Sequence, residues 1–305
     1  MIEDDDGLGR LAGKAARHWR WARADGLARL AEEDDLRPVR RASRAWRKWR
    51  WRRSHAVAVG SAVPVWLVGV QRSGTNMVVR GLEERPEVEV HNENDRRAFD
   101  RFRLRADERL RDIVLASRHH LVLFKPLCDS HRVDELLALD TPSSGKAIWA
   151  YRGVDGRVRS ALAKFGDTNL RVLTEIAAGR GADRWQAQRL SPESLELLRS
   201  FDWSAVSPAS AAALFWYVRN SLFFELGLDA RDDVLLSSYD RLIADPEAGT
   251  LAVAAFLGLA WDPAMASHME QRASVEVRPL DLDPRVRRLC RELEDRLDAV
   301  AAARA

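Results

Sequence analysis

The sequence predicts an α/β protein with a parallel sheet that is flanked by helices. From residue 64 onward, short β-branched runs alternate with stretches of helical spacing, a pattern typical of strands joined by crossover helices. The first of these runs lies in "WLVGVQRSGTNMV", residues 66–78, where an apolar stretch ends in glycine and a polar loop leads into a helix. A strand, a glycine-containing loop and a helix in this order can bind phosphate.

Length and composition favour one large domain with an N-terminal appendage. The chain has 305 residues, of which 46% are hydrophobic and 31% charged, as in ordinary globular proteins. We place a basic, Trp-rich helical arm at 1–55 and the α/β domain at 56–305. The formal net charge of +3 is close to balance and indicates no partner by itself.

Cysteine usage and hydropathy favour a cytoplasmic setting. The two cysteines, Cys128 and Cys290, are far apart and do not have metal-ligand spacing, so we expect neither a disulfide scaffold nor a metal. The acidic start "MIEDDDGLGR" does not look like a secretory signal. The longest apolar run, at 56–70, is interrupted by Gly60 and Pro64 and is shorter than the ~20 residues of a spanning helix.

The N-terminal arm combines helical spacing with a block of positive charge. From Arg37 to Arg53 the chain carries nine Lys or Arg residues and no acid, interleaved with Trp46, Trp49 and Trp51. Two interpretations remain open. The arm packs its tryptophans on the main domain, or it binds an anionic surface, either a substrate or the inner face of a membrane. We expect no nucleic acid as partner, because no reader motif is present. Helical spacing also links Leu8, Leu11, Ala15, Trp19 and Ala22.

In the main domain, apolar β-branched runs predict the strands. The expected strands are 65–70, 88–91, 121–125, 147–152 and 234–238. The expected helices begin near Thr75, Asp95, Ser130, Asp155, Pro208 and Pro246, and a final helix covers 284–303. The stretch 166–181 looks most like a loop and could serve as a lid. In such sheets, ligands bind at the carboxyl ends of the strands.

The loop after the first expected strand has the chemistry of an anion site. Gly69 and Gly74 have the spacing of the nucleotide-binding P-loop, but Thr75 stands where that motif has its lysine. Glycines allow close backbone approach, and the following helix offers its N-terminal dipole. The side chains that could aim donors at one anion are Arg72, Ser73, Thr75 and Asn76.

A second segment, "IWAYRGVDGRVRSALAKF" at 148–165, suggests another anion contact. An expected strand ends at Arg152, and Ser160 follows in the second turn of the next helix. Arginine supplies charge and forked donors, and serine supplies a compact hydroxyl. One anion could therefore meet both side chains.

Together these segments resemble the PAPS-dependent sulfotransferase family. In that family an [RK]-S-G-T loop binds the 5′-phosphosulfate of the donor, which here is Arg72-Ser73-Gly74-Thr75. A later R-x7-S element binds the 3′-phosphate, which corresponds to Arg152 with Ser160. The segment "LLSSYDRLIADPEAGTLAVAAFLGL" at 235–259 resembles a third family motif, whose tyrosine lies beside the adenine and is Tyr239 here. The resemblance covers about residue 65 to the C-terminus.

The resemblance implies a P-loop-like fold, PAPS (3′-phosphoadenosine 5′-phosphosulfate) as donor, and adenosine 3′,5′-bisphosphate as product. It implies no metal and leaves the acceptor open: a carbohydrate, a glycolipid or a small natural product. Val154, Gly156 and the pair after Tyr239 depart from the family pattern. No basic cluster near the C-terminal end clearly matches the family's further 3′-phosphate contacts, for which Arg272 and Arg278 are candidates.

Lys125 and Glu93 are the remaining candidates for catalysis. Lys125 ends an expected strand at the same sheet edge as Arg72, where a cation could stabilise the transferred group. The small-molecule branch of the family uses a histidine two residues after this lysine, but Leu127 stands there. Other branches use a glutamate after the second strand, which makes Glu93 the expected base, with His131 and His91 as alternatives. Glu93 and Asp95 could instead only cap a helix.

Two other functions stay open at this point. One is an atypical P-loop nucleotide-binding protein or kinase, which would need the lysine that Thr75 replaces. The other is a non-catalytic relative that keeps the binding pocket.

Overall fold

The computed structural model describes residues 38–269 and 279–303. The chain forms two compact units, Met1–Trp51 and Arg52–Ala305. The helical spacing expected at 8–22 and the candidate phosphate contacts Arg272 and Arg278 lie outside the described residues.

The basic segment of the arm is a helix, α3 (Pro38–His55). Trp46 and Trp49 expose 55% and 46% of their surface, and the Arg50 guanidinium lies 5.0 Å from the centre of the Trp46 ring. These two tryptophans therefore present apolar rings among positive charges. Among the described helices, none has the length and apolar character needed to cross a membrane.

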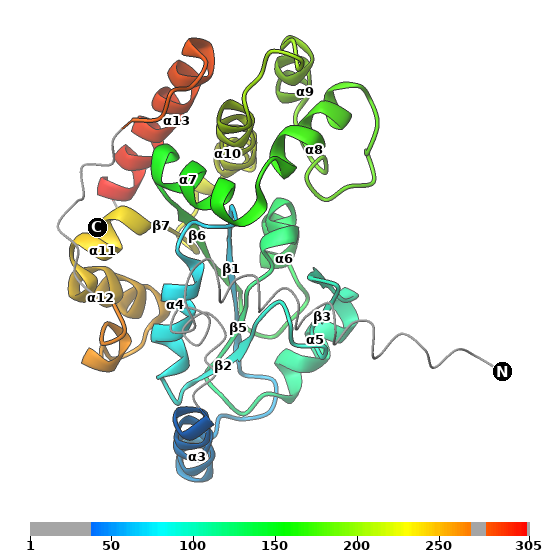
Figure 1. The fold of residues 1–305 in the computed structure, drawn as a ribbon. Helices are drawn as coiled ribbons and strands as arrows, with labels where there is room; N and C mark the ends of the chain where they lie inside the picture. The colour runs from blue at the N-terminus through cyan, green and yellow to red at the C-terminus, as the bar shows by residue number, and fades with distance from the viewer. Residues whose placement is uncertain (1–37, 270–278, 304–305) are drawn as a thin grey trace. The chain divides into compact units, whose positions relative to one another are not determined.

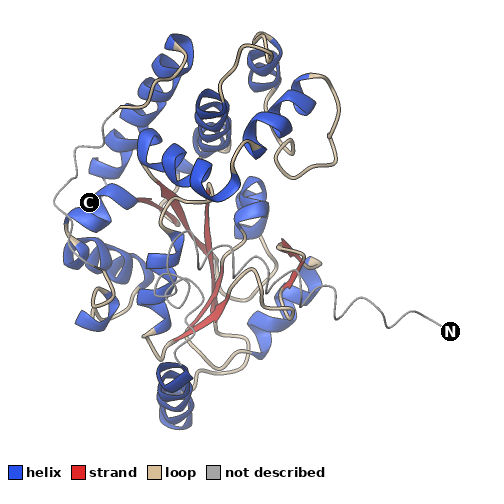
Figure 2. Cartoon of the chain, viewed as in Figure 1, coloured by secondary structure: helices blue, strands red, loops and turns tan. Residues whose placement is uncertain are grey.

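The main unit contains the predicted parallel sheet (Figures 1 and 2). Its strands lie in the order β2-β5-β1-β6-β7, and every neighbouring pair is parallel. The strands are β1 (Val63–Gly69), β2 (Val88–His91), β5 (Leu121–Phe124), β6 (Lys146–Tyr151) and β7 (Val234–Ser238), which confirms all the predicted strands. Since β1 is central, the crevice beside its carboxyl end is where a ligand is expected.

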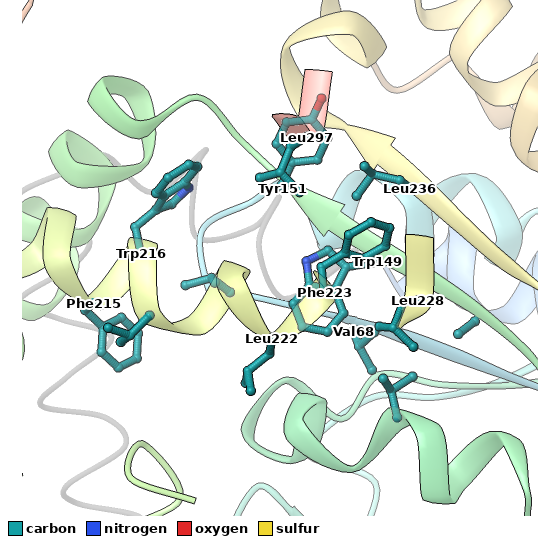
Figure 3. Packing of buried hydrophobic residues seen from close by; sticks show 14 of the residues in the cluster. Val68, Trp149, Tyr151, Phe215, Trp216, Leu222, Phe223, Leu228, Leu236 and Leu297 are labelled. Carbon is teal, nitrogen blue, oxygen red and sulfur yellow. The ribbon is translucent and has the colours of Figure 1, made fainter. Parts of the chain in front are cut away.

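Strand side chains alternate between two apolar layers. On one face, Trp66 and Val68 of β1 join a large buried cluster with residues of helices α6 (Val133–Leu137), α10 (Pro208–Glu225) and α13 (Pro284–Ala303). Trp149 and Phe223 meet inside this cluster with ring centres 5.9 Å apart (Figure 3). On the other face, Val65 and Leu67 pack with helices α4 (Thr75–Glu83) and α12 (Pro246–Leu257). Burial on both faces explains the nearly continuous apolar runs.

Local capping fixes where several helices begin. Ser207 accepts a hydrogen bond from the Ser210 backbone before α10, and Asp245 accepts one from the Ala248 backbone before α12. Both helices have proline at their first position, where the missing N–H costs nothing. The predicted starts near Thr75, Asp155, Pro208, Pro246 and Pro284 are confirmed, the second by α7 (Val154–Phe165). Near Ser130 a short turn, η1 (Leu127–Arg132), precedes α6.

The prediction of a helix that begins near Asp95 is wrong. The Asp95 carboxylate accepts from the Arg97 backbone N–H at 2.9 Å and makes a local turn, which competes with helix formation. The chain then forms a small hairpin, β3 (Phe99–Asp100) and β4 (Arg103–Leu104), before α5 (Asp107–Ala116).

The prediction of a loop at 166–181 is wrong as well. Its centre is a helix, α8 (Thr168–Ala177), and the glycines that suggest a loop stand only at its ends. Gly166 and Gly179 both have positive φ, so they end helices and do not interrupt one. The irregular segment is 178–190, which is followed by α9 (Pro192–Arg199).

Candidate active site

The loop between β1 and α4 passes close to two neighbours. A side chain at Gly69 would place its Cβ 2.2 Å from the Ala150 carbonyl oxygen on β6. A side chain at Gly74 would place its Cβ 2.2 Å from Cδ2 of Tyr239, which begins α11 (Tyr239–Ala244). Both glycines have positive φ, and so does Arg72 at 74°. Strained φ at a non-glycine residue often marks a functional loop.

Ser130 holds the start of this loop. The Gly69 N–H donates to the Ser130 hydroxyl at 3.0 Å, and that hydroxyl lies 3.0 Å from the Gly69 carbonyl oxygen. Ser130 belongs to η1, which follows β5, so the loop is tied to the neighbouring strand on each side. Sequence reasoning missed this role because the two residues are 61 positions apart.

The two predicted anion motifs meet in space. Arg72 donates from Nε to the Ser160 hydroxyl at 2.9 Å, which joins the loop to the second turn of α7. The Arg152 guanidinium lies over the Tyr239 ring, 4.3 Å from its centre, and Tyr239 in turn packs on Gly74. Arg72, Gly74, Arg152, Ser160 and Tyr239, which the resemblance assigns to one nucleotide, therefore lie in one neighbourhood.

Two further residues support the second motif. Arg157, one turn before Ser160, is almost fully buried and donates to the Gln71 and Ala212 carbonyl oxygens. Burial and the neighbouring Arg72 charge lower the pKa of Arg157 to about 9, which still leaves it charged at neutral pH. The Asp240 carboxylate accepts from the Gly153 N–H at 2.7 Å, so the departure at position 240 has a structural role. In the sequence, the signal for this role of Arg157 was its i, i+3 spacing from Ser160, which places the two side chains on one face of a helix.

Lys125, Asn76 and Glu93 also come together. Lys125 donates to the Asn76 side-chain oxygen at 2.7 Å and lies 3.6 Å from the Glu93 carboxylate. The Glu93 side chain is only 18% exposed. Burial raises its pKa above the ordinary 4.5, the Lys125 charge opposes that shift, and the Asp129 charge adds to it. A carboxylate with a raised pKa is better matched to proton abstraction near neutrality.

The alternative bases have less suitable surroundings. Burial lowers the pKa of His131 to about 3, and the charges of Arg219, Arg103, Arg132 and Arg189 act in the same direction. His91 is fully buried, stacked on Phe124, and held by Asp95 at 2.8 Å. Since no helix begins at Asp95 and Glu93 pairs with Lys125, the capping interpretation of these acids is wrong.

The loop offers donors that suit an anion. Ser73 is buried, and its hydroxyl has no hydrogen-bond partner among the described residues. Thr75 is buried in the first turn of α4, where helix N–H groups and dipole favour negative charge. Within the described residues, no three His, Cys, Asp or Glu side chains are arranged to hold a metal.

Similar proteins were found among solved structures only. No protein-family model matches the sequence, and no curated protein matches it. The sulfotransferase domain of the Synechococcus PCC 7002 olefin synthase is 15% identical with a TM-score of 0.44, over 77% of this chain and 95% of that one. A sulfotransferase from Alicyclobacillus acidocaldarius is 14% identical with a TM-score of 0.40, over 81% and 96%. A mouse sulfotransferase complexed with PAP is 12% identical with a TM-score of 0.39, over 83% and 92%.

At these identities and TM-scores, the fold and the chemistry must both be argued from this chain's own residues. The parallel sheet with central β1, the glycine loop after it and the helices on both faces are as the sequence predicts. By its own strand order and by the glycine loop between β1 and α4, the chain has a P-loop-like α/β fold.

Proposed function

We propose that the protein transfers a sulfuryl group from PAPS to a hydroxyl or amine of an acceptor. The observation that carries the proposal is the 2.9 Å hydrogen bond from Arg72 to Ser160. It brings the 5′-end loop and the 3′-phosphate motif together, as one nucleotide with anions at both ends requires. ATP carries no 3′-phosphate and would leave the second motif without a ligand.

The donor set fits such a nucleotide. A phosphosulfate needs N–H and O–H donors at the loop, and the buried Ser73 hydroxyl lacks a partner there among the described residues. Gly74 leaves room for the Tyr239 ring, and that ring carries the Arg152 guanidinium on its face. Arg152 and Ser160 would hold the 3′-phosphate, and Tyr239 would lie by the adenine.

The catalytic roles follow from position and charge. PAPS supplies an activated S–O bond, which breaks as the acceptor oxygen or nitrogen bonds to sulfur and the bisphosphate leaves. Arg72 and Lys125 would stabilise negative charge on the transferred group and on the leaving phosphate. Glu93, beside Lys125, would accept the proton of the acceptor.

Other functions fit these residues less well. A kinase of the P-loop type needs a lysine after Gly74, and Thr75 occupies that position. A non-catalytic relative would have no use for a buried carboxylate with raised pKa beside Lys125.

Incubation with PAPS labelled in its sulfur tests the function directly. An extract of the source cells supplies acceptors, and mass spectrometry identifies the sulfated product. We expect labelled product, and a rate that EDTA leaves unchanged. Strict dependence on magnesium with ATP as donor would favour the kinase instead.

For the arm, we propose contact with an anionic membrane surface. The exposed rings of Trp46 and Trp49 among the basic residues of α3 support it. We expect the full chain to sediment with vesicles of anionic lipid and a chain lacking residues 1–53 to sediment less, with salt weakening the difference. Equal sedimentation of both chains would contradict this role.

A further inference from the structure

Arg219 is a buried charge that no described carboxylate pairs with directly, although Glu225 and Asp129 act on it through space. It lies in α10 and is 3% exposed. One guanidinium nitrogen, Nη1, donates to the Gln188 carbonyl oxygen at 3.1 Å, and the group lies 5.6 Å from the centre of the Trp185 ring. The other nitrogen, Nη2, is buried. Within the described part of the chain it has no hydrogen-bond partner, and no carboxylate there forms an ion pair with Arg219. Burial lowers its pKa to about 10, so it remains charged at neutral pH.

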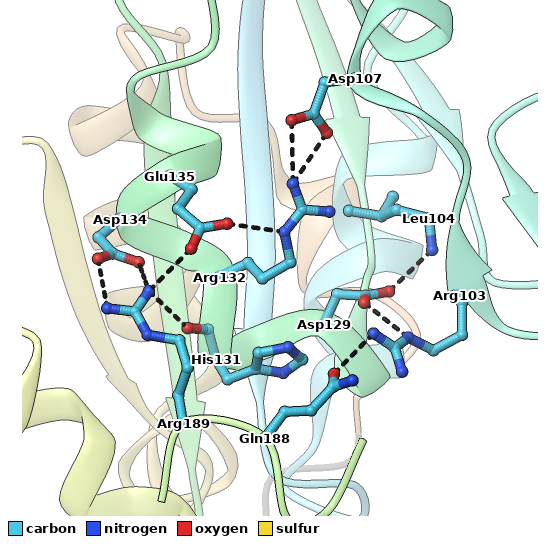
Figure 4. Close-up of polar contacts among 10 residues, drawn as sticks. All are labelled: Arg103, Leu104, Asp107, Asp129, His131, Arg132, Asp134, Glu135, Gln188 and Arg189. Carbon is cyan, nitrogen blue, oxygen red and sulfur yellow. Dashed lines mark hydrogen bonds and ion pairs between the residues drawn. The ribbon is translucent and has the colours of Figure 1, made fainter. Parts of the chain in front are cut away.

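Further donors surround this arginine. His131 is buried, and its Nδ1 has no partner among the described residues. Arg103 donates to the Asp129 carboxylate at 2.7 Å and to the Gln188 side-chain oxygen at 2.9 Å (Figure 4). Gln188 thus bridges two arginines, with its carbonyl on one and its side chain on the other. Asp129 pairs directly with Arg103, so Arg219 has only the more distant charges of Asp129 and Glu225 to balance it.

These groups lie beside the proposed catalytic residues. The turn η1 follows Lys125 within two residues and carries Cys128, Asp129 and His131. The Asp129 carboxylate of this turn acts electrostatically on both Glu93 and Arg219, so it lies near both. The cluster therefore adjoins Glu93 through η1.

We infer that the acceptor carries an anionic group of its own, a carboxylate or a sulfate, and that Arg219 binds it with His131 at its side. This rests on the proposed sulfuryl transfer. A guanidinium binds a carboxylate or sulfate more strongly than a neutral carbonyl, since both partners are charged and two parallel hydrogen bonds can form. The anion would therefore replace the Gln188 carbonyl on Arg219 and use the unpartnered Nη2.

The segment 178–190 covers Arg219 and has a defined anchor. Trp185 and Gln188 of this segment contact Arg219. The anchor is Arg189, near the end of the segment, which has a φ of 58°. Arg189 pairs with Asp134 at 2.6 Å and donates to the His131 carbonyl oxygen at 3.2 Å (Figure 4). Arg189 holds the segment at α6 and η1. Replacing the Gln188 carbonyl on Arg219 by an anion therefore needs only a local shift around Gln188.

Calorimetry on protein saturated with adenosine 3′,5′-bisphosphate tests the inference. The probes are two pairs that differ in charge: 4-hydroxybenzoate with 4-hydroxybenzamide, and glucuronate with glucose. We expect the charged member of at least one pair to bind about tenfold or more tightly than its neutral partner. Arg219→Met should remove that preference, and Arg219→Lys should keep part of it. Arg296→Met is the control, because Arg296 also stacks on a ring, that of Phe224, but is exposed.

The outcomes separate this inference from the proposed function. Bisphosphate affinity should be the same in all these variants, and Arg219→Met should melt no lower than wild type, because it removes a buried charge that has no directly paired carboxylate. Charged and neutral probes that bind equally to the wild type, or not at all, would overturn the anionic acceptor. So would a preference that survives Arg219→Met. Failure of the bisphosphate to bind would instead overturn the proposed sulfuryl transfer.

Discussion

Replacing Glu93 by glutamine is expected to lower turnover about 100-fold or more, a typical share for general base catalysis. Glutamine keeps the size and one accepting oxygen of the side chain but removes its basicity. The protein should stay folded and bind the donor nucleotide normally, because Glu93 contacts Lys125 and the Leu127 backbone, which lie outside the loop. Steady-state rates with a verified acceptor, alongside a bisphosphate titration, measure both effects.

The pH profile gives the same test without relying on one variant. Glu93 works as a carboxylate, so the rate should rise as pH increases through its pKa. Burial raises that pKa above 4.5, and the acid limb of kcat/KM should therefore lie above the usual range of a glutamate. The limb should vanish in Glu93→Gln. His131→Asn is the matched control and should lower the rate less than Glu93→Gln, because burial lowers the pKa of His131 to about 3. An active Glu93→Gln with an inactive His131→Asn would refute the assignment of the base.

Replacing Arg72 by alanine is expected to lower turnover by about 100-fold, while bisphosphate affinity falls far less. The Arg72 charge matters most when the bridging oxygen becomes anionic, and a donor that acts mainly in the transition state affects rate more than binding. Arg72 also donates to Ser160, so Arg72→Lys, which keeps the charge without that planar donor group, should recover part of the rate. Unchanged turnover with collapsed nucleotide affinity would make Arg72 a binding residue only.

The sheet could be predicted from sequence because each strand is buried on both faces. Runs such as 121–125 have no other stable place in a soluble fold, and β5 ends within one residue of the expected end. The chain between the strands was harder to predict. The Asp95 carboxylate accepts a hydrogen bond from the Arg97 N–H and makes a local turn where a helix was expected. The glycines around α8 stand at helix ends, and composition does not reveal whether a glycine ends a helix or belongs to a loop.

Candidate site residues could be proposed from sequence where one short segment carries the chemistry. The loop residues and the Arg152–Ser160 element were found as motifs, and the structure brings them together. Ser130 and Arg219 could not be found this way, because each acts on a residue of another element. Ser130 is 61 positions from Gly69, and Arg219 is 31 from Gln188. Their roles depend on tertiary packing.

The central claim is that one nucleotide with anions at both ends occupies the two motifs. Calorimetry with adenosine 3′,5′-bisphosphate, AMP and ATP tests it most directly. We predict that the bisphosphate binds more tightly than AMP or ATP by about 1.5–3 kcal/mol, the range for hydrogen bonds to charged groups, and that Arg152→Ala removes most of this difference. Arg296→Ala should leave it unchanged. Equal affinity of the wild-type protein for AMP and the bisphosphate would contradict the assignment of the donor.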